Sequence, residues 1–448
     1  MIEPLEESVA AKAAAPAAAP PRVSMITAGV VTLASRIAVI LLSAVTGIIS
    51  ARMLGPAERG LYVIPGIEAS FVFATFSGLS VAVSYFMLNR SAGRGALRPA
   101  LLTAAGLIAA GSGVITVMGV TAHATWSIAP AITALVPYAA LNVASGYFLG
   151  RARVVTNTLL MSSLALATFV FITAALVQFG ARAAVAVNAW LVALFVVAIA
   201  GAVLVWSDAR FKPNVPVPFR EFSAYALKIG LTNLTSLLNY RIDVYLVALY
   251  TKPADLAVYT LAVMAAELVG TFTQVVPQIT LPEIGRLNIA ESADYTARWA
   301  RANVALAGIA CAGLFVLAPY LITIAYGEAF AGAVQPLRVL LIGAFAMAPC
   351  SLFSTYFTIK LGRPRLPLVI NVSSAVVSAA IGVVLIPRIG VMGGAVATAV
   401  SYVLGTVIAL VYFARISGMS VPATMLVRRE DLVLLQGILR RLRSRCAF

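Results

Sequence analysis

The sequence predicts an all-α polytopic membrane protein of about 12 transmembrane helices in two homologous six-helix lobes. Its composition is the first observation that predicts this. Hydrophobic residues make up 61% of the 448 residues, charged residues only 11%, and the mean hydropathy is +0.99, whereas a globular chain carries about 25% charged residues. The second observation is the length of the apolar runs, which reach the ~20 residues needed to cross a hydrocarbon layer of ~30 Å. Runs this continuous exclude barrel strands, which would alternate.

An internal duplication is the third observation. The turn Pro56-Ala57-Glu58, followed by Tyr62, returns nearly half a chain later as Pro253-Ala254-Asp255, followed by Tyr259. A second motif, Leu149-Gly150-Arg151-x-Arg153, returns at a similar offset as Leu361-Gly362-Arg363-x-Arg365. Two homologous bundles joined head to tail are typical of membrane transporters, whose substrate site lies between the halves.

The apolar runs place the individual spans along the chain. We expect them at 24–50, 61–88, 99–121, 127–150, 156–179, 183–206, 223–250, 256–281, 302–325, 336–359, 366–387 and 392–414. The first six form a lobe over 23–207 and the second six a lobe over 222–415. The polar, proline-punctuated stretch 208–221 between them is the expected cytoplasmic linker.

The two ends of the chain lie outside this repeat. Residues 1–22 are rich in Ala and Pro and lack the basic start and apolar core of a signal peptide, so we expect a disordered cytoplasmic leader. Residues 416–448 carry leucines at helical spacing among arginines. This pattern predicts a basic amphipathic helix on the cytoplasmic membrane surface. The alternative is a helix that docks on a cytoplasmic synthesis partner.

The formal charge of +16 is explained by topology rather than by nucleic acid. With the amino terminus inside, most of the 32 Lys and Arg residues fall on the inner side of the predicted spans, which is the positive-inside bias. The sequence therefore predicts a multi-pass membrane protein with both termini cytoplasmic. A single histidine, His123, leaves no metal cluster or histidine-based catalytic set, so we expect no metal, no cofactor and no catalytic residues.

Five charges inside the predicted spans are the candidate functional residues, because a charge at the bilayer centre costs about 2.5–3.5 kcal/mol. We expect a water-filled cavity between the halves in which arginines hold an anion, since guanidinium binds phosphate oxygens bidentately. Carboxylates nearby would exchange a proton or sodium ion. The expected anion-binding residues are Arg36 and Arg241, and the expected ion-coupling residues are Asp243, Glu68 and Glu267.

An alternative interpretation of the same charges stays open: they are structural ion pairs that fix helix packing. Arg241 and Asp243 are two residues apart, so on a helix they point to different sides and each needs another partner. Three further cations near the external ends of spans, Arg52, Arg59 and Lys252, are expected to be solvated loop charges.

The first turn and its second copy carry a family resemblance. The run Ser50-Ala-Arg-Met-Leu-Gly-Pro-Ala-Glu-Arg-Gly-Leu-Tyr62 resembles the first-loop signature of the polysaccharide and oligosaccharide flippases of the multidrug/oligosaccharidyl-lipid/polysaccharide exporter superfamily. Arg241-Ile-Asp243 through Tyr259 is similar to that family's seventh span and following loop, with Asp243 where an aspartate is usual. The Leu-Gly-Arg-x-Arg loops also fit, so the resemblance covers roughly 24–415.

The resemblance implies two six-helix lobes in a V around a central cavity, and alternating access driven by a proton or sodium gradient or by the membrane potential. The implied substrate is an isoprenoid-diphosphate-linked saccharide, moved from the inner to the outer leaflet for lipopolysaccharide O-antigen, capsule or exopolysaccharide. The implied partners are this lipid-linked glycan, membrane lipids and other polysaccharide-assembly proteins.

Two other function classes compete with this expectation. A drug/cation antiporter of the same superfamily would share the fold but favour an acidic cavity without arginines in the spans. A membrane-embedded glycosyltransferase or polysaccharide polymerase would need a sizeable external loop with acids or a catalytic histidine, and the predicted external loops are short. The sequence therefore favours a transporter over an enzyme.

Overall fold

The computed structural model describes residues 25–90, 94–121, 127–209, 215–363 and 365–425. Within these ranges the chain is built of helices and contains no strand, and ten segments are long and apolar enough to cross a membrane. The predicted leader 1–22 and the main part of the predicted tail helix, 426–448, lie outside the described residues, as do residues 210–214 of the linker.

The first lobe is formed by five helices, of which the first makes two crossings. Helix α1 has 66 residues and bends at Gly55, whose φ of 68° and ψ of 177° suit glycine. The connection expected between the first two spans is therefore a kink within one helix rather than a loop. The helices of this lobe are α1 (Met25–Arg90), α2 (Leu97–Thr121), α3 (Ala129–Gly150), α4 (Val154–Phe179) and α5 (Ala183–Ala209).

The second lobe repeats this plan with more interruptions. Its first helix, α6 (Phe219–Tyr250), is long enough to cross a membrane but more polar than the ten candidate spans. The others are α7 (Pro253–Thr273), α8 (Val275–Arg286), α9 (Ile289–Tyr326), the turn η2 (Glu328–Ala333), α10 (Val334–Met347), α11 (Cys350–Thr355), η3 (Tyr356–Lys360), α12 (Arg365–Ile389), α13 (Val391–Ser417) and the short α14 (Val421–Met425). Segments α7–α8 and α10–η3 each make one crossing.

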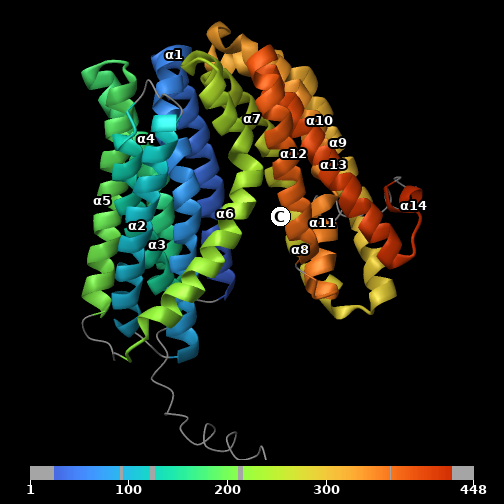
Figure 1. Cartoon of the computed structure of the whole chain (residues 1–448), viewed down its shortest axis with the longest axis horizontal. Helices are drawn as coiled ribbons and strands as arrows, with labels where there is room; N and C mark the ends of the chain where they lie inside the picture. The colour runs from blue at the N-terminus through green and yellow to red at the C-terminus, as the bar shows by residue number, and fades with distance from the viewer. Residues whose placement is uncertain (1–24, 91–93, 122–126, 210–214, 364, 426–448) are drawn as a thin grey trace, which may run out of the picture.

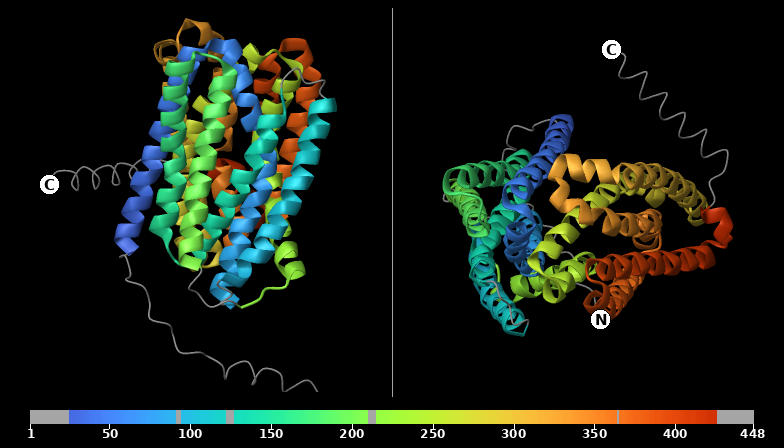
Figure 2. Two further views of the ribbon diagram at one scale, coloured as in Figure 1. Left: turned by 90° about the vertical axis from the view of Figure 1, so that its left-hand side faces the viewer. Right: turned by 90° about the horizontal axis from the view of Figure 1, so that it is seen from above.

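The predicted fold class is confirmed. Counting the two arms of α1 separately and including α6, the described residues make twelve crossings, six in each lobe. The lobes stand as a V, with α1–α5 on one side, α7–α13 on the other and α6 between them (Figure 1). They meet where α1 bends and diverge toward the end at which α2 begins, which the charge distribution predicts to be cytoplasmic (Figures 1 and 2).

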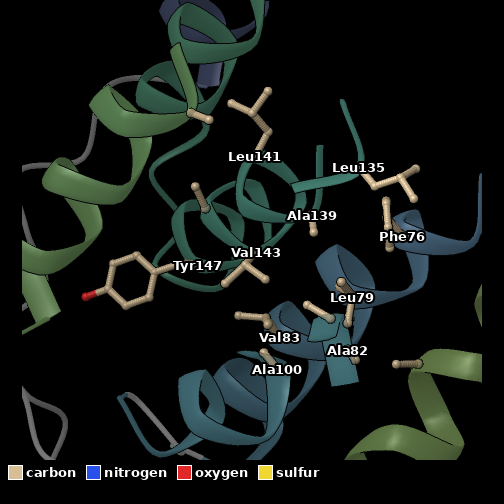
Figure 3. Close-up of a cluster of buried hydrophobic side chains, with 14 of the residues drawn as sticks. Phe76, Leu79, Ala82, Val83, Ala100, Leu135, Ala139, Leu141, Val143 and Tyr147 are labelled. Atoms are coloured by element: carbon tan, nitrogen blue, oxygen red, sulfur yellow. The ribbon is translucent and has the colours of Figure 1, made fainter. Parts of the chain in front are cut away.

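Each lobe has its own apolar core. In the first lobe, side chains from the second arm of α1 interlock with those of α3, and Phe76, Leu79 and Leu135 are fully buried (Figure 3). In the second lobe, α7 supplies more residues of the largest cluster than any other helix, and the cluster also contains Ala51 and Ile64 from the two sides of the α1 bend. The α1 bend is thus packed into the core of the opposite lobe.

Helix α6 contacts both lobes. Its amino-terminal half lies so close to α1 that a β-carbon added at Gly78 would come within 2.1 Å of the Ala226 carbonyl oxygen, and one at Gly230 within 2.4 Å of the Thr75 carbonyl oxygen. Its carboxyl-terminal half joins the second lobe's core through Val244 and Val247. Small residues such as these glycines allow helices to approach closely in a bilayer. Because α6 contacts both lobes, the predicted lobe 222–415 begins on a helix that the two lobes share.

The close approach of α6 to α1 predicts a specific destabilisation. We expect Gly230→Val to lower the free energy of unfolding by about 1–3 kcal/mol, because the new side chain would overlap the α1 backbone. The matched control is Gly113→Val on α2, where an added β-carbon would have no neighbour within 4 Å. Thermal unfolding of the detergent-solubilised protein measures the difference, and equal effects of the two substitutions would contradict the tight α1–α6 contact.

Candidate functional site

A polar cavity of about 520 Å³ lies inside the second lobe. It is bounded by α6, α7, α10, α11, α12 and α13, and its lining mixes carboxylates, hydroxyls and aromatic rings with apolar side chains. The polar lining residues include Tyr240, Asp243, Glu267, Thr271, Gln274, Ser351, Ser354, Asn371, Thr398 and Tyr402. A pocket this size with a few convergent polar groups is the usual form of a small-ligand or ion site.

Asp243 is the most deeply buried charge in this cavity. It is 4% exposed on α6, and one carboxylate oxygen, Oδ2, accepts hydrogen bonds from the Tyr259 hydroxyl at 2.5 Å and from Thr398 Oγ1 at 2.8 Å. These donors belong to α7 and α13, so the carboxylate ties three helices together. Two neutral donors can stabilise a buried carboxylate without cancelling its charge, so binding of a cation or a proton would neutralise an ionised Asp243.

Arg241 is paired with Glu267 rather than with Asp243. The guanidinium nitrogens lie 3.0 Å and 3.3 Å from the two Glu267 carboxylate oxygens, so the contact between α6 and α7 is bidentate. Both side chains are partly exposed, at 33% and 42%. The expectation that Arg241 and Asp243 point to different partners agrees with this geometry. The alternative of a structural ion pair also describes Arg241 and Glu267 in this conformation.

The other two sequence-predicted residues lie elsewhere. Arg36 is exposed on the first arm of α1, and Glu68 is 3% exposed on the second arm; neither lines the cavity. The structure thus brings together Arg241, Asp243 and Glu267. This cavity within the second lobe has two carboxylates in its lining and one arginine beside it. The cationic cavity expected between the halves, with Arg36 and Arg241, stays a prediction.

Sequence reasoning missed the two donors to Asp243. Tyr259 carried a signal, because it is the repeated tyrosine of the second turn, but a repeated residue does not reveal its hydrogen-bond partner. Thr398 is 155 positions from Asp243 and sits in an apolar run with no motif. Only the packing of α13 against α6 places its hydroxyl at the carboxylate.

The two repeated turns meet each other where the lobes converge. An added β-carbon at Gly60 would lie 1.8 Å from the Pro253 carbonyl oxygen, so the first turn rests directly on the second. Arg59 is 2% exposed, donates to the Ala257 carbonyl oxygen at 3.1 Å and lies over the Phe330 ring at 5.7 Å. The expectation that Arg59 is a solvated loop charge is wrong, because the lobes enclose it.

Arg52 joins the same contact between the lobes. Its side chain is exposed, as expected for a cation at a span end, yet it donates to the Ala325 carbonyl oxygen at 2.8 Å and also to that of Ile324. These carbonyls end α9, where unpaired oxygens and the helix dipole favour a cation. Lys252 is exposed immediately before α7, in line with the solvated charge expected there. We refer to Arg52, Arg59, Gly60, Pro253 and Ala257 as the apex contact.

Comparison with known proteins shows which proteins share this fold. Residues 152–335 match the family described as polysaccharide biosynthesis protein. The structure resembles an inward-facing multidrug resistance MATE family transporter of the MOP superfamily, with a TM-score of 0.70, 16% identity and coverage of 87% of this chain and 98% of that one. It also resembles the lipid II flippase MurJ in its inward closed conformation, with a TM-score of 0.61, 15% identity and 93% of each chain covered. No curated protein matches the sequence.

These findings define the fold of the protein. The chain has the fold of MOP-superfamily transporters. The match to a polysaccharide biosynthesis family, together with this fold, supports the polysaccharide exporter and flippase family expected from the turn motifs. An outward-facing MATE family transporter matches with a lower TM-score, 0.58, at 15% identity and with 88% and 95% of the two chains covered.

The apex contact predicts how the two lobes respond to loss of Arg59. We expect Arg59→Gln to shift the population away from the V arrangement by about tenfold or more, because a hydrogen bond from a charged donor contributes about 1.5–3 kcal/mol. Spin labels at Asn89→Cys on α1 and Thr358→Cys on η3, both exposed near the diverging ends of the lobes, would report a shorter distance.

The control for this experiment is Arg182→Gln, which changes an exposed arginine before α5. The same labels should show the wild-type distance in that variant. An unchanged distance distribution in Arg59→Gln would mean that the apex contact does not hold the V arrangement.

Proposed function

We propose that this protein is a secondary transporter that flips an isoprenoid-diphosphate-linked oligosaccharide from the inner to the outer leaflet of a bacterial inner membrane. The product would serve assembly of a cell-surface polysaccharide such as O-antigen, capsule or exopolysaccharide. The observation that carries the proposal is the match of residues 152–335 to a polysaccharide biosynthesis family, since this range contains Arg241, Asp243 and Glu267. Both termini would lie in the cytoplasm, with membrane lipids and other polysaccharide-assembly proteins as partners.

The physical demands of such a substrate support this proposal. A diphosphate-sugar head cannot cross hydrocarbon unaided, because each charge loses its hydration there. Between the diverging lobes the head would stay out of lipid, while the isoprenoid tail remains in the bilayer. Arg241 is one-third exposed, so its guanidinium is accessible to a phosphate group. A diphosphate would compete with Glu267 for the same bidentate donors.

Competition between substrate and Glu267 gives Arg241 two partners in two states of the transport cycle. Without substrate, the ion pair neutralises both side chains at a partly buried position. With substrate, the arginine would turn to the phosphate and release a carboxylate, which a proton or sodium ion would then neutralise. Asp243, 4% exposed and lining the adjacent cavity, would be the second position that takes up a cation. Movement of the anionic head would thus be coupled to an ion gradient or to the membrane potential.

A second candidate function is supported by the charge of the same cavity. Two carboxylates, Asp243 and Glu267, line it, and an acidic cavity suits a drug/cation antiporter of this superfamily. The pairing of Glu267 with Arg241 leaves Asp243 as the remaining acid for a cationic drug. The polysaccharide biosynthesis match favours the flippase over this candidate.

The flippase proposal predicts a loss of function in Arg241→Ala. In proteoliposomes with a fluorescent isoprenoid-diphosphate oligosaccharide, we expect the wild type to make the labelled head accessible to an outside sugar-modifying enzyme. We expect Arg241→Ala to slow this at least tenfold, because charge-assisted bonds to the phosphate contribute about 1.5–3 kcal/mol. The matched control is Arg182→Gln, an exposed arginine away from the cavity. Absence of accessibility with intact wild-type protein under proton and sodium gradients would favour the antiporter.

The coupling role of Asp243 predicts a separate phenotype. Asp243→Asn keeps the size of the side chain and an oxygen that can accept from Tyr259 and Thr398, but removes the charge. We expect this variant to fold and to lose the acceleration of transport that an imposed proton or sodium gradient gives the wild type. Thr398→Val, which removes one hydrogen bond but keeps the carboxylate, is the control. A variant that responds to both gradients like the wild type would exclude Asp243 as the coupling residue.

A further inference from the structure

A second cavity, of about 950 Å³, lies in the first lobe and is separate from the cavity at Asp243. It is bounded by α2, α3, α5 and the start of α6, and its lining is almost entirely apolar. The lining residues are Gly95, Leu97, Arg98, Pro99, Leu101, Leu102, Ala140, Val143, Ala144, Ala202, Val205, Trp206, Pro216, Val217 and Phe219. This volume is at the upper end of the ~300–1,000 Å³ of ligand pockets.

Small side chains create this groove. Helices α2 and α5 both pack on α3, and the positions that α3 and α5 present between them include Ala140, Ala144 and Ala202. The lining comes from the first turns of α2 and the last turns of α5, so the groove lies at the predicted cytoplasmic end of the lobe. In Figures 1 and 2 these helices lie on the side of the first lobe that faces away from the second lobe.

The described lining of the groove carries a positive charge, that of Arg98. Among the described residues of the lining, Arg98 is the one that is ionisable, and its side chain is exposed. The acids nearest along the bounding helices are occupied elsewhere: Asp208 lies 3.2 Å from Arg153, and Glu221 lies 2.7 Å from Arg90. Trp206 is 66% exposed at the same end, the position at which tryptophan marks a membrane interface. An apolar groove with a cation at its interfacial end is complementary to an anionic lipid.

We infer that this groove binds an anionic glycerophospholipid of the predicted cytoplasmic leaflet. One or more acyl chains would lie along α2 and α5 over the alanines of the groove, and the headgroup phosphate would contact Arg98. Basic pockets between transmembrane helices on this side of a membrane bind anionic headgroups in this way. Of the helices that bound the groove, α2 and α5 lie on the side of the first lobe away from the second lobe (Figure 1), whereas the path proposed for the substrate runs between the lobes.

The test is a titration of the detergent-solubilised full chain with dioleoylphosphatidylglycerol, followed by native mass spectrometry, with dioleoylphosphatidylcholine in parallel. We expect phosphatidylglycerol to bind more tightly than phosphatidylcholine. Arg98→Gln should weaken phosphatidylglycerol about fivefold and bring the two lipids close together, since a cation near the membrane surface contributes about that factor. Ala202→Phe should weaken both lipids, because the ring would fill the space of an acyl chain.

Matched variants separate the groove from the general surface. Arg182→Gln removes an exposed arginine just before α5, at the end of that helix opposite to the groove. Ala200→Phe adds a ring at an exposed position of α5 that does not line the groove. Both should bind phosphatidylglycerol like the wild type. Ala202 and Arg98 are exposed, so their variants should keep the unfolding temperature of the lipid-free protein.

Two results would overturn the inference. Phosphatidylglycerol binding that is unchanged in both Arg98→Gln and Ala202→Phe would mean that the groove does not hold the lipid. An isoprenoid phosphate that displaces phosphatidylglycerol at lower concentration, with the same dependence on Arg98 and Ala202, would instead make the groove a site for the tail and phosphate of a lipid-linked sugar. The binding measurement does not depend on transport, so its outcome is independent of the proposed flippase activity.

Discussion

The contact between the two repeated turns is the interaction on which the arrangement of this protein depends. The lobes have separate cores, diverge along their length, and converge where Gly60 rests on Pro253 and Arg59 is enclosed. A buried guanidinium is tolerated only where its donors find acceptors. Arg59 finds the Ala257 carbonyl and the Phe330 ring, both from the opposite lobe. Its Nε has no hydrogen-bond partner among the described residues, which limits how strongly this contact holds the lobes together.

The duplication gives this contact its form. Each half contributes one copy of the same turn, so the lobes meet through related surfaces, as in a two-fold interface between identical subunits. The two copies of the turn nevertheless make different hydrogen bonds within the protein. Glu58 accepts a hydrogen bond from the Ala183 amide at the start of α5 at 2.5 Å, within its own lobe. Asp255 of the second copy is exposed, and the tyrosine that follows it bonds Asp243 instead. A residue of the repeated motif, Tyr259, thus donates one of the two side-chain hydrogen bonds to Asp243.

The low dielectric of the bilayer explains how the charges of the second lobe are arranged. Arg241 and Glu267 neutralise each other, and Asp243 is stabilised by two hydroxyls from neighbouring helices. These contacts fix α6 against α7 and α13, yet they leave a carboxylate beside a cavity of about 520 Å³. The same residues therefore stabilise helix packing and form a place where a cation or an anion would change the charge balance. The first lobe has a different surface, an apolar groove with Arg98 at its end, which suits lipid rather than a polar ligand.

The sequence by itself determined the helical membrane class, the number of crossings and the relation between the halves. Hydropathy and spacing are local properties, and a hydrocarbon solvent leaves a continuous apolar chain few options other than helices. It also singled out Arg241, Asp243 and Glu267, because charges are costly in apolar spans. Tertiary structure alone decided which charges meet. Arg59 was expected in solvent and is enclosed, and Thr398 carried no signal at all. The side chains that surround a residue come from helices far away in sequence. The angle at which two helices pack depends on the side chains of both, so it cannot be predicted from either helix alone.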